Sequence, residues 1–217
     1  MSEVTITVRG EYEERVAPEE AVAHIVVRAE GPERAPVVDL LSSRSAPIGA
    51  DLTARQAQGA LLRWSSQRMF VWSERPWADG RRLAPVHHAS IELAAVFADA
   101  PTLSAWLGEV AERDGIDIGA IEWQLSRETA KQVESAVAAR AVEVAVERAT
   151  AYASAIGCTH VVPLEIADAG LLGNPDGTPA PRMLRAAAML ADGGSALDLR
   201  PEDITVTATV EARFFAR

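Results

Sequence analysis

The sequence has a single cysteine, Cys158, among its 217 residues. One thiol excludes an intramolecular disulfide, and so little cysteine is typical of proteins that fold in a reducing compartment. The first residues enter an alternating apolar pattern directly, without the basic segment and apolar run of a secretory signal peptide. We therefore expect a cytoplasmic protein.

Basic charge and long apolar stretches are scarce as well. Lysine and arginine number 21 against 31 aspartates and glutamates, which gives a net charge of -10. The field of such a chain repels polyanions, so we expect no binding to nucleic acid. No stretch is apolar for long enough to span a membrane, so we expect no membrane span. With 48% hydrophobic residues, the chain can nevertheless bury a large core.

Sequence motifs that would identify an enzyme are also missing. The chain contains no GxxxxGK[ST] loop, no GxGxxG turn, no HExxH, no GxSxG and no paired CxxC. We therefore expect a non-enzymatic protein without a metal or cofactor, and we assign no catalytic residue.

The longest periodic segment runs from Ser126 to Ile156 and predicts an amphipathic helix. Ser126 is a suitable N-cap, and Gly157 can end the helix in the left-handed conformation. Helical spacing places these residues on the predicted buried face: Val133, Val137, Ala141, Val144, Ala145, Tyr152 and Ile156. Many alanines add little bulk, so a sheet or a second helix can approach closely. The helix belongs either to the core or to a subunit interface.

Alternating apolar and polar residues predict strands in much of the remaining chain. The predicted strands occupy residues 4–8, 21–29, 61–73, 89–97, 121–125, 161–168 and 204–214. The first two are predicted to form one hairpin and the next two a second, with Asp79 and Gly80 as a turn signal in its connection. Pro163 indicates that its strand lies at a sheet edge.

Shorter helices and one irregular stretch complete the prediction. A helical segment covers residues 35–58, either as one bent helix or as two short helices divided at Pro47. Asp99 can cap a short amphipathic helix that ends at Asp114. Residues 169–201 are rich in glycine and proline around a short apolar helix at 183–190, which predicts a flexible excursion.

Together these elements predict an α+β fold. Its mainly antiparallel sheet of hairpins packs against one long helix and one or two shorter helices. We expect one domain over residues 1–217, either undivided or built of two sub-lobes.

The most unusual local composition is RWSSQRMFVWSERPW, residues 63–77. Tryptophan and arginine together can stack on a planar or anionic ligand, anchor a partner at an interface, or simply pack over the sheet. The candidate residues in this Trp/Arg hairpin are Trp64, Arg68, Trp72, Arg75 and Trp77. Trp64 and Trp72 both occupy even positions, which predicts that they share one face.

Histidines supply two further groups of candidates. His87 and His88 are neighbours in a strand, so they point to opposite faces and cannot bind one metal together without a bulge. Each is either a packed histidine or part of a ligand site. Cys158 and His160 flank Thr159, a spacing that suits a thiolate pair or half of a metal site, but a buried cysteine beside a turn histidine is the preferred interpretation. Because no further ligand accompanies them, we assign no metal site.

Three stretches of the chain resemble one protein family: ITVRGEYEERVAPEEAVAHIVVRAEG, VHHASIELAAVFAD and RPEDITVTATVEARF. Together they resemble the SIMPL-domain family, which includes periplasmic immunogenic proteins and stress-associated envelope proteins of bacteria. Its opening pattern is carried here by Gly10, Ala17, Pro18, Glu19 and Ala21. The resemblance implies an α+β domain that assembles into ring-like or channel-like homo-oligomers, with no catalytic residues to carry over. The chain departs from the family in Tyr12, where a second glycine is common, and in its missing signal peptide.

The sequence leaves two functions open. The first is a non-enzymatic protein that acts through homo-oligomeric assembly or partner binding, with the long helix and the Trp/Arg hairpin as contact surfaces. The second is a small-ligand-binding protein or enzyme whose site lies near the hairpin, His87 and His88. Replacing Trp72 and Trp77 by alanine should disturb assembly under the first hypothesis and ligand binding under the second.

Overall fold

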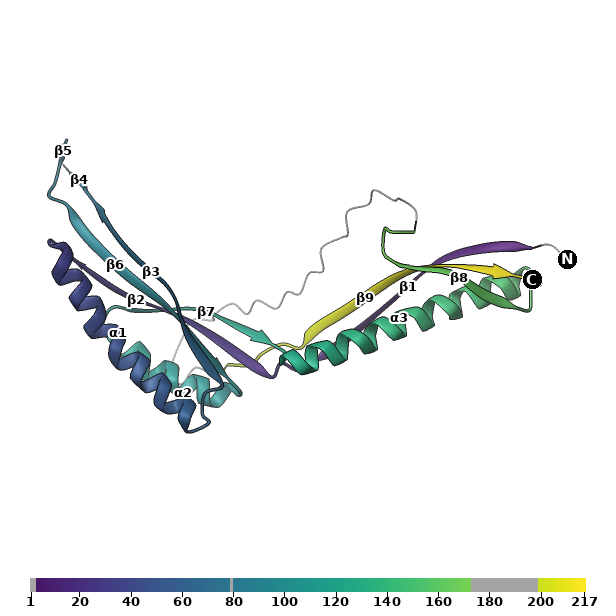
Figure 1. The fold of residues 1–217 in the computed structure, drawn as a ribbon, viewed down its shortest axis with the longest axis horizontal. Helices are drawn as coiled ribbons and strands as arrows, with labels where there is room; N and C mark the ends of the chain where they lie inside the picture. The colour runs from purple at the N-terminus through teal and green to yellow at the C-terminus, as the bar shows by residue number, and fades with distance from the viewer. Residues whose placement is uncertain (1–2, 79, 173–198) are drawn as a thin grey trace. The chain divides into compact units, whose positions relative to one another are not determined.

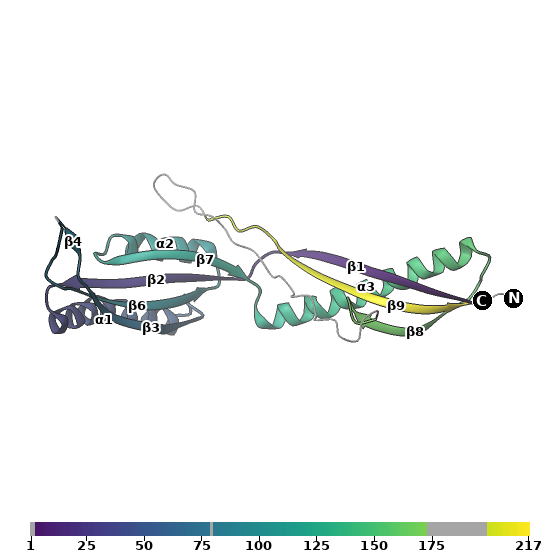
Figure 2. The same ribbon diagram turned by 90° about the horizontal axis from the view of Figure 1, so that it is seen from above.

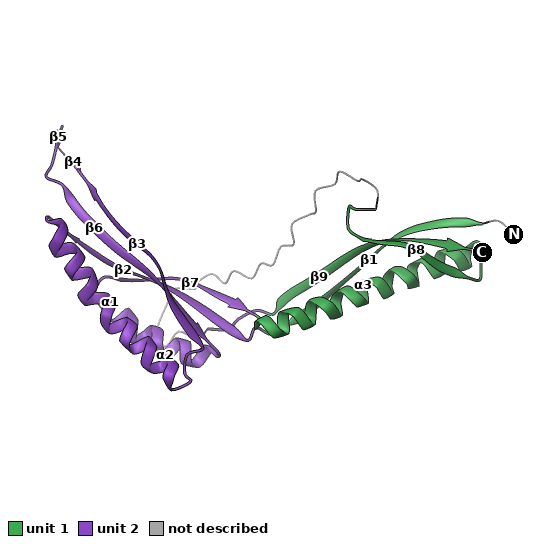
Figure 3. Ribbon diagram, viewed as in Figure 1, with its two compact units in different colours: residues 1–17, 125–185, 203–217 green, residues 18–124, 186–202 purple. Residues whose placement is uncertain are grey.

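The computed structural model describes residues 3–78, 80–172 and 199–217 (Figure 1). These residues form an α+β fold with three helices and antiparallel sheets, as the sequence predicts. They divide into two compact units (Figure 3): the described residues of unit 1 are 3–17, 125–172 and 203–217, and those of unit 2 are 18–78, 80–124 and 199–202. The predicted helix at 183–190 and most of the predicted excursion at 169–201 lie outside the described residues.

Unit 2 is a four-stranded antiparallel sheet with two helices on one face (Figure 1). The strand order is β3-β6-β2-β7 (Figure 2). Its strands are β2 (Glu20–Gly31), β3 (Arg63–Glu74), β6 (Val86–Phe97) and β7 (Ile116–Gln124), and its helices are α1 (Arg34–Ala57) and α2 (Ala100–Ala111). The short strands β4 (Trp77–Ala78) and β5 (Arg81–Arg82) pair with each other within the β3–β6 connection. The second predicted hairpin is therefore confirmed.

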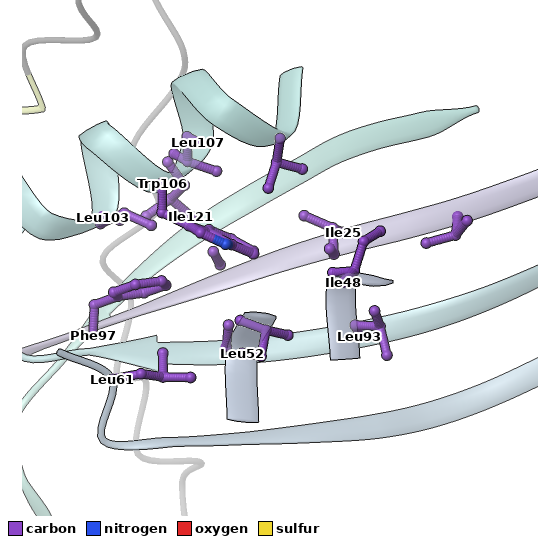
Figure 4. Packing of buried hydrophobic residues seen from close by; sticks show 14 of the residues in the cluster. Ile25, Ile48, Leu52, Leu61, Leu93, Phe97, Leu103, Trp106, Leu107 and Ile121 are labelled. Carbon is purple, nitrogen blue, oxygen red and sulfur yellow. The ribbon is translucent and has the colours of Figure 1, made fainter. Parts of the chain in front are cut away.

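One core lies between this sheet and its helices (Figure 4). Alternate residues of β2 and β6 point into it, including Ala21, Ala23, Ile25, Val27, Leu93, Ala95 and Phe97. The fully buried Trp106 of α2 donates its Nε1 hydrogen to Asp51 of α1 at 3.0 Å. Arg55 binds both oxygens of the same carboxylate at 3.0 Å and reaches Glu109 of α2 at 2.5 Å. These polar contacts satisfy the indole N–H and connect the two helices.

α1 is one continuous helix although it contains Pro47. Val37 and Leu41 before the proline, and Ile48 and Leu52 after it, are all buried in the same core. Packing on both sides therefore offsets the backbone hydrogen bond that Pro47 cannot donate. Of the two alternatives for this segment, the single helix is correct.

Unit 1 packs the long helix α3 (Arg127–Ala155) against a three-stranded sheet. The strand order is β1-β9-β8, with β1 (Val4–Val16), β9 (Ile204–Ala216) and β8 (Val161–Asp168). Ser126 accepts a hydrogen bond from the Thr129 amide at 3.2 Å, and Gly157 adopts a φ of 82°, so both predicted helix ends are confirmed. β8 lies at the sheet edge, as Pro163 indicates. No helix in the described part of the chain is both long and apolar enough to cross a membrane.

Small residues form the face of α3 that meets the sheet. They are Ala141, Ala145, Ala149 and Ala153, all of them buried. A Cβ atom on Gly10 of β1 would lie 2.7 Å from the Ala145 nitrogen and 2.9 Å from its Cβ, and closer still to the Ala141 carbonyl oxygen. The alanines therefore allow the close approach that the sequence predicts, and at Gly10 the strand has no room for a side chain.

The predicted hairpin between residues 4–8 and 21–29 is wrong. Both stretches form strands, but β1 pairs with β9 along its whole length, while β2 lies between β6 and β7. Residues 9–16, which lie between the two predicted strands, continue β1. Alternation identifies a strand and its two faces, but it carries no information about which other strand is its partner.

The predicted buried face of α3 is partly wrong. Val137, Ala141 and Ala145 are buried as expected, whereas Tyr152 and Ile156 are more than half exposed. The sheet follows the alanine stripe to Ala149 and Ala153, because small residues permit a close approach that a tyrosine would block.

Candidate functional site

A bulge in β3 divides the tryptophans of the Trp/Arg hairpin between two faces of the sheet. The register between β3 and β6 shifts at Gln67, which has no paired residue on β6. Before the bulge, Trp64 pairs with Ala95 on the helix-covered face and packs against the core. Beyond it, Trp72 pairs with His88 on the opposite face, which no described helix covers and which we call the uncovered face. The prediction that the two tryptophans share a face is therefore wrong, because one extra residue reverses the alternation.

On the uncovered face, one row of residues crosses three strands. Glu30 of β2 pairs with His88 of β6, which in turn pairs with Trp72 of β3. The indole and imidazole rings are stacked, with centroids 5.1 Å apart and 16° between their planes. His88 Nδ1 lies 3.6 Å from a carboxylate oxygen of Glu30, and its Nε2 lies 3.4 Å from one of Glu74. Among the described residues, the buried Nε2 atom has no hydrogen-bond partner.

A cleft of about 510 Å³ opens beside this row. Its walls include Trp72, His88, Glu30, Glu74, Arg28 and Arg44. Arg28 forms an ion pair with Asp117 of β7 at 2.7 Å, and Arg44 of α1 donates to the Arg28 carbonyl oxygen at 2.6 Å. The volume falls within the range of small-molecule sites in proteins. The cleft therefore combines an aromatic surface, a histidine and charges of both signs.

His87 lies away from this cleft. Neighbouring residues of a strand point to opposite sides, so His87 points away from the face that carries His88. It lies on the helix-covered face of β6, together with Ala89. Its Nδ1 is buried without a hydrogen-bond partner in the described part of the chain. The structure thus separates the two histidines as the sequence predicts, and it places only His88 beside Trp72.

The remaining candidates of the hairpin lie near its tip or along β3. Trp77 of β4 is 67% exposed, and the Arg82 guanidinium lies 5.8 Å from its ring centroid. Arg75 is exposed between β3 and β4, and Arg68 is exposed on β3 opposite Glu92. These residues form an open surface rather than a pocket.

The sequence analysis missed an ionic network around the buried Glu20, at the opposite end of β2. Glu20 accepts hydrogen bonds from Arg63 of β3 at 3.2 and 2.8 Å and from Gln124 of β7 at 2.7 Å. The bonds from Arg63 hold the pKa of the Glu20 carboxyl below its ordinary value, although burial opposes this shift. The network therefore connects three strands through one carboxylate. The only signal in the sequence is a glutamate that directly precedes the apolar run of β2.

Cys158 and His160 close the end of α3. The Cys158 amide donates to the Ala153 carbonyl oxygen at 2.9 Å, and Thr159 Oγ1 lies 2.9 Å from His160 Nδ1. Within residues 3–78, 80–172 and 199–217, no three His, Cys, Asp or Glu side chains gather as a metal site would require. The contacts of these two residues are thus those of a helix terminus.

Comparison with known proteins identifies one family. A search among curated proteins finds no match. A family model does match, over residues 6–214: it is named SIMPL and described as a protein of unknown function (DUF541). The matched range includes Gly10, the alanine stripe of α3 and the stacked pair of Trp72 and His88. Because the match covers nearly the whole chain, the protein belongs to the SIMPL family.

Proposed function

We propose that this protein is a non-enzymatic assembly protein whose copies associate through the exposed part of the Trp/Arg hairpin. The observation that supports this proposal is a concentration of exposed apolar residues on and beside an edge strand. These residues are Met69, Phe70, Trp72, Trp77 and Leu83. Tryptophan, phenylalanine, methionine and arginine are enriched in protein interfaces, and a large apolar surface of this kind is rarely left in water.

Charge supports a second copy of the chain as the partner. The stretch 63–82 carries five arginines against Glu74 and Asp79, whereas the whole chain has a net charge of -10. A second copy therefore offers the acidic surface that a basic hairpin would attract, for example the exposed Glu11 and Glu13 of β1. Among the described residues, β3 has a neighbour on one side only, so its other edge is open to a partner.

Trp77→Ala should weaken this assembly. Truncating an anchoring tryptophan at an interface costs about 2 kcal/mol, which corresponds to roughly a 30-fold higher dissociation constant. Native mass spectrometry on the full chain, purified without metal chelators, measures the subunit number over a dilution series. We expect the variant to dissociate at higher concentrations than the wild type.

Tyr152→Ala is the matched control, because Tyr152 is an aromatic residue of similar exposure on α3. It should assemble like the wild type. If Trp77→Ala also assembles normally, the hairpin is not the contact surface. A wild-type chain that stays monomeric at all concentrations would overturn self-association and leave a different protein as the partner.

A further inference from the structure

Two carboxylates stand beside the aromatic row of unit 2, and among the described residues neither pairs with an arginine or a lysine. Glu30 and Glu74 approach the two ring nitrogens of His88 at 3.6 and 3.4 Å. Both side chains are mostly exposed, and within the described part of the chain their ion-pair contacts are to this histidine alone. Their negative charges are therefore accessible from the cleft.

The arginines in the walls of the cleft have other partners. Arg28 is paired with Asp117 at 2.7 Å, and Arg44 is anchored by its 2.6 Å hydrogen bond to the Arg28 carbonyl oxygen. The Arg28 charge is thus neutralised by the Asp117 carboxylate. Glu30 and Glu74 balance the two guanidinium groups in the walls, and Asp117 beside Arg28 gives the carboxylates an excess of one, so a cation is favoured over an anion as the ligand.

Trp72 adds an aromatic face to the cleft. One face of the indole stacks on His88, yet Trp72 remains 44% exposed, so part of its ring system can contact a ligand. His88 Nε2 is buried 3.4 Å from a Glu74 carboxylate oxygen and has no hydrogen-bond partner among the described residues.

From these contacts we infer that the cleft binds a small organic cation that carries a guanidinium group. The planar guanidinium can lie against Trp72 and donate in its plane to Glu74, while Glu30 adds a second negative charge. A metal ion fits less well, because the two carboxylates approach opposite nitrogens of one ring and do not converge on one point. This function does not depend on the assembly proposed above, although Trp72 belongs to both surfaces.

Isothermal titration of the full chain with agmatine at low ionic strength tests the inference. Agmatine offers a guanidinium and no carboxylate. We expect saturable binding to the wild type and at least roughly tenfold weaker binding to Glu74→Gln, because a charge-assisted hydrogen bond is lost. Glu112→Gln, which changes an exposed glutamate beyond the end of α2, should bind like the wild type. Trp72→Leu should also bind weakly, since it keeps apolar volume but loses the aromatic face.

Circular dichroism establishes that each variant is folded before titration. Equal affinity in Glu74→Gln and Glu112→Gln would overturn the inference, as would a wild type that shows no saturable binding up to about 10 mM agmatine. Tighter binding of inorganic phosphate than of agmatine would overturn the choice of a cation.

An arginine of a neighbouring copy would offer the same chemistry as a free guanidinium ligand. Native mass spectrometry with agmatine distinguishes the two sources. Agmatine that binds without changing the subunit number supports a free ligand, whereas agmatine that dissociates an oligomer supports the arginine of a neighbour. A wild type that assembles normally but does not bind agmatine would refute the cleft and leave the assembly proposal intact.

Discussion

Gly10 of β1 is the residue at which the long helix comes closest to its sheet. The Ala141 carbonyl and the Ala145 backbone occupy the space that a side chain at this position would need. The requirement is spatial rather than conformational, because Gly10 lies within a regular ladder opposite Val210. Gly10 belongs to the N-terminal sequence pattern that the chain shares with the SIMPL family, and this contact gives a physical reason for a glycine at that position.

Gly10→Ala should destabilise unit 1. The added methyl group must push α3 away from β1, and overpacking of this kind costs about 1–3 kcal/mol. Urea unfolding of the full chain, followed by circular dichroism, measures the loss. Gly108→Ala is the control, because a Cβ atom there meets nothing within 4 Å and alanine favours the helix α2 by about 0.5–1 kcal/mol. Equal midpoints for Gly10→Ala and the wild type would refute the close contact.

Among the elements, those defined by local interactions could be predicted and those defined by distant pairing could not. Asp99 accepts from the Thr102 amide at 2.7 Å, and Ser126 caps α3 in the same way, so both helix starts depend on residues three positions apart. The partner of β1, in contrast, is β9 at the far end of the chain. Nothing within β1 itself specifies that choice.

In the candidate site, too, the features set by local interactions could be predicted and those set by distant strand pairing could not. His87 and His88 lie on opposite faces because alternation in β6 is a local property. That His88 stacks on Trp72 depends on the register of two strands, and the bulge at Gln67 sets that register. The carboxylates of the cleft come from β2 and β3, so only the assembled sheet brings them to one histidine.

The network around Glu20 makes a prediction about how β2, β3 and β7 are held together. Glu20→Gln removes the charge that Arg63 and Gln124 bind, which should cost about 1–3 kcal/mol at neutral pH. The pKa of Glu20 is lowered by folding, so this stabilisation is present above the ordinary pKa of the carboxyl, 4.5, and is lost as the pH falls through the folded value. Urea unfolding at several pH values measures both effects.

The difference in stability between the wild type and Glu20→Gln should therefore shrink in acid. Glu112→Gln is an exposed control and should match the wild type at every pH. If the stability difference between the wild type and Glu20→Gln stays constant from neutral pH to below the folded pKa, the carboxylate charge does not contribute to stability. The difference would then come only from how the glutamine side chain packs and hydrogen-bonds.

For the whole molecule, the path of the chain distinguishes the two units. Every fully buried member of the unit 2 core lies within residues 18–124, with Leu199 packed against it from outside that range. The ends of this stretch are adjacent, since the Glu19 amide donates to the Gln124 carbonyl oxygen at 3.0 Å. Unit 1 instead combines residues from both ends of the chain with α3 and β8. Unit 2 thus has the form of a domain inserted between β1 and α3.

A fragment of residues 18–124 should therefore fold alone. It keeps all four strands of its sheet, both helices and the Glu20 network, so its urea unfolding should be cooperative, and its near-ultraviolet circular dichroism should report the packed Trp106. A fragment of residues 125–217 should not fold cooperatively, because β9 then lacks β1, and the alanine stripe of α3 loses the strand that carries Gly10. A gradual, non-cooperative transition of the 18–124 fragment would contradict the inserted-domain organisation. It would also indicate that unit 2 needs the packing of Leu199 against its core.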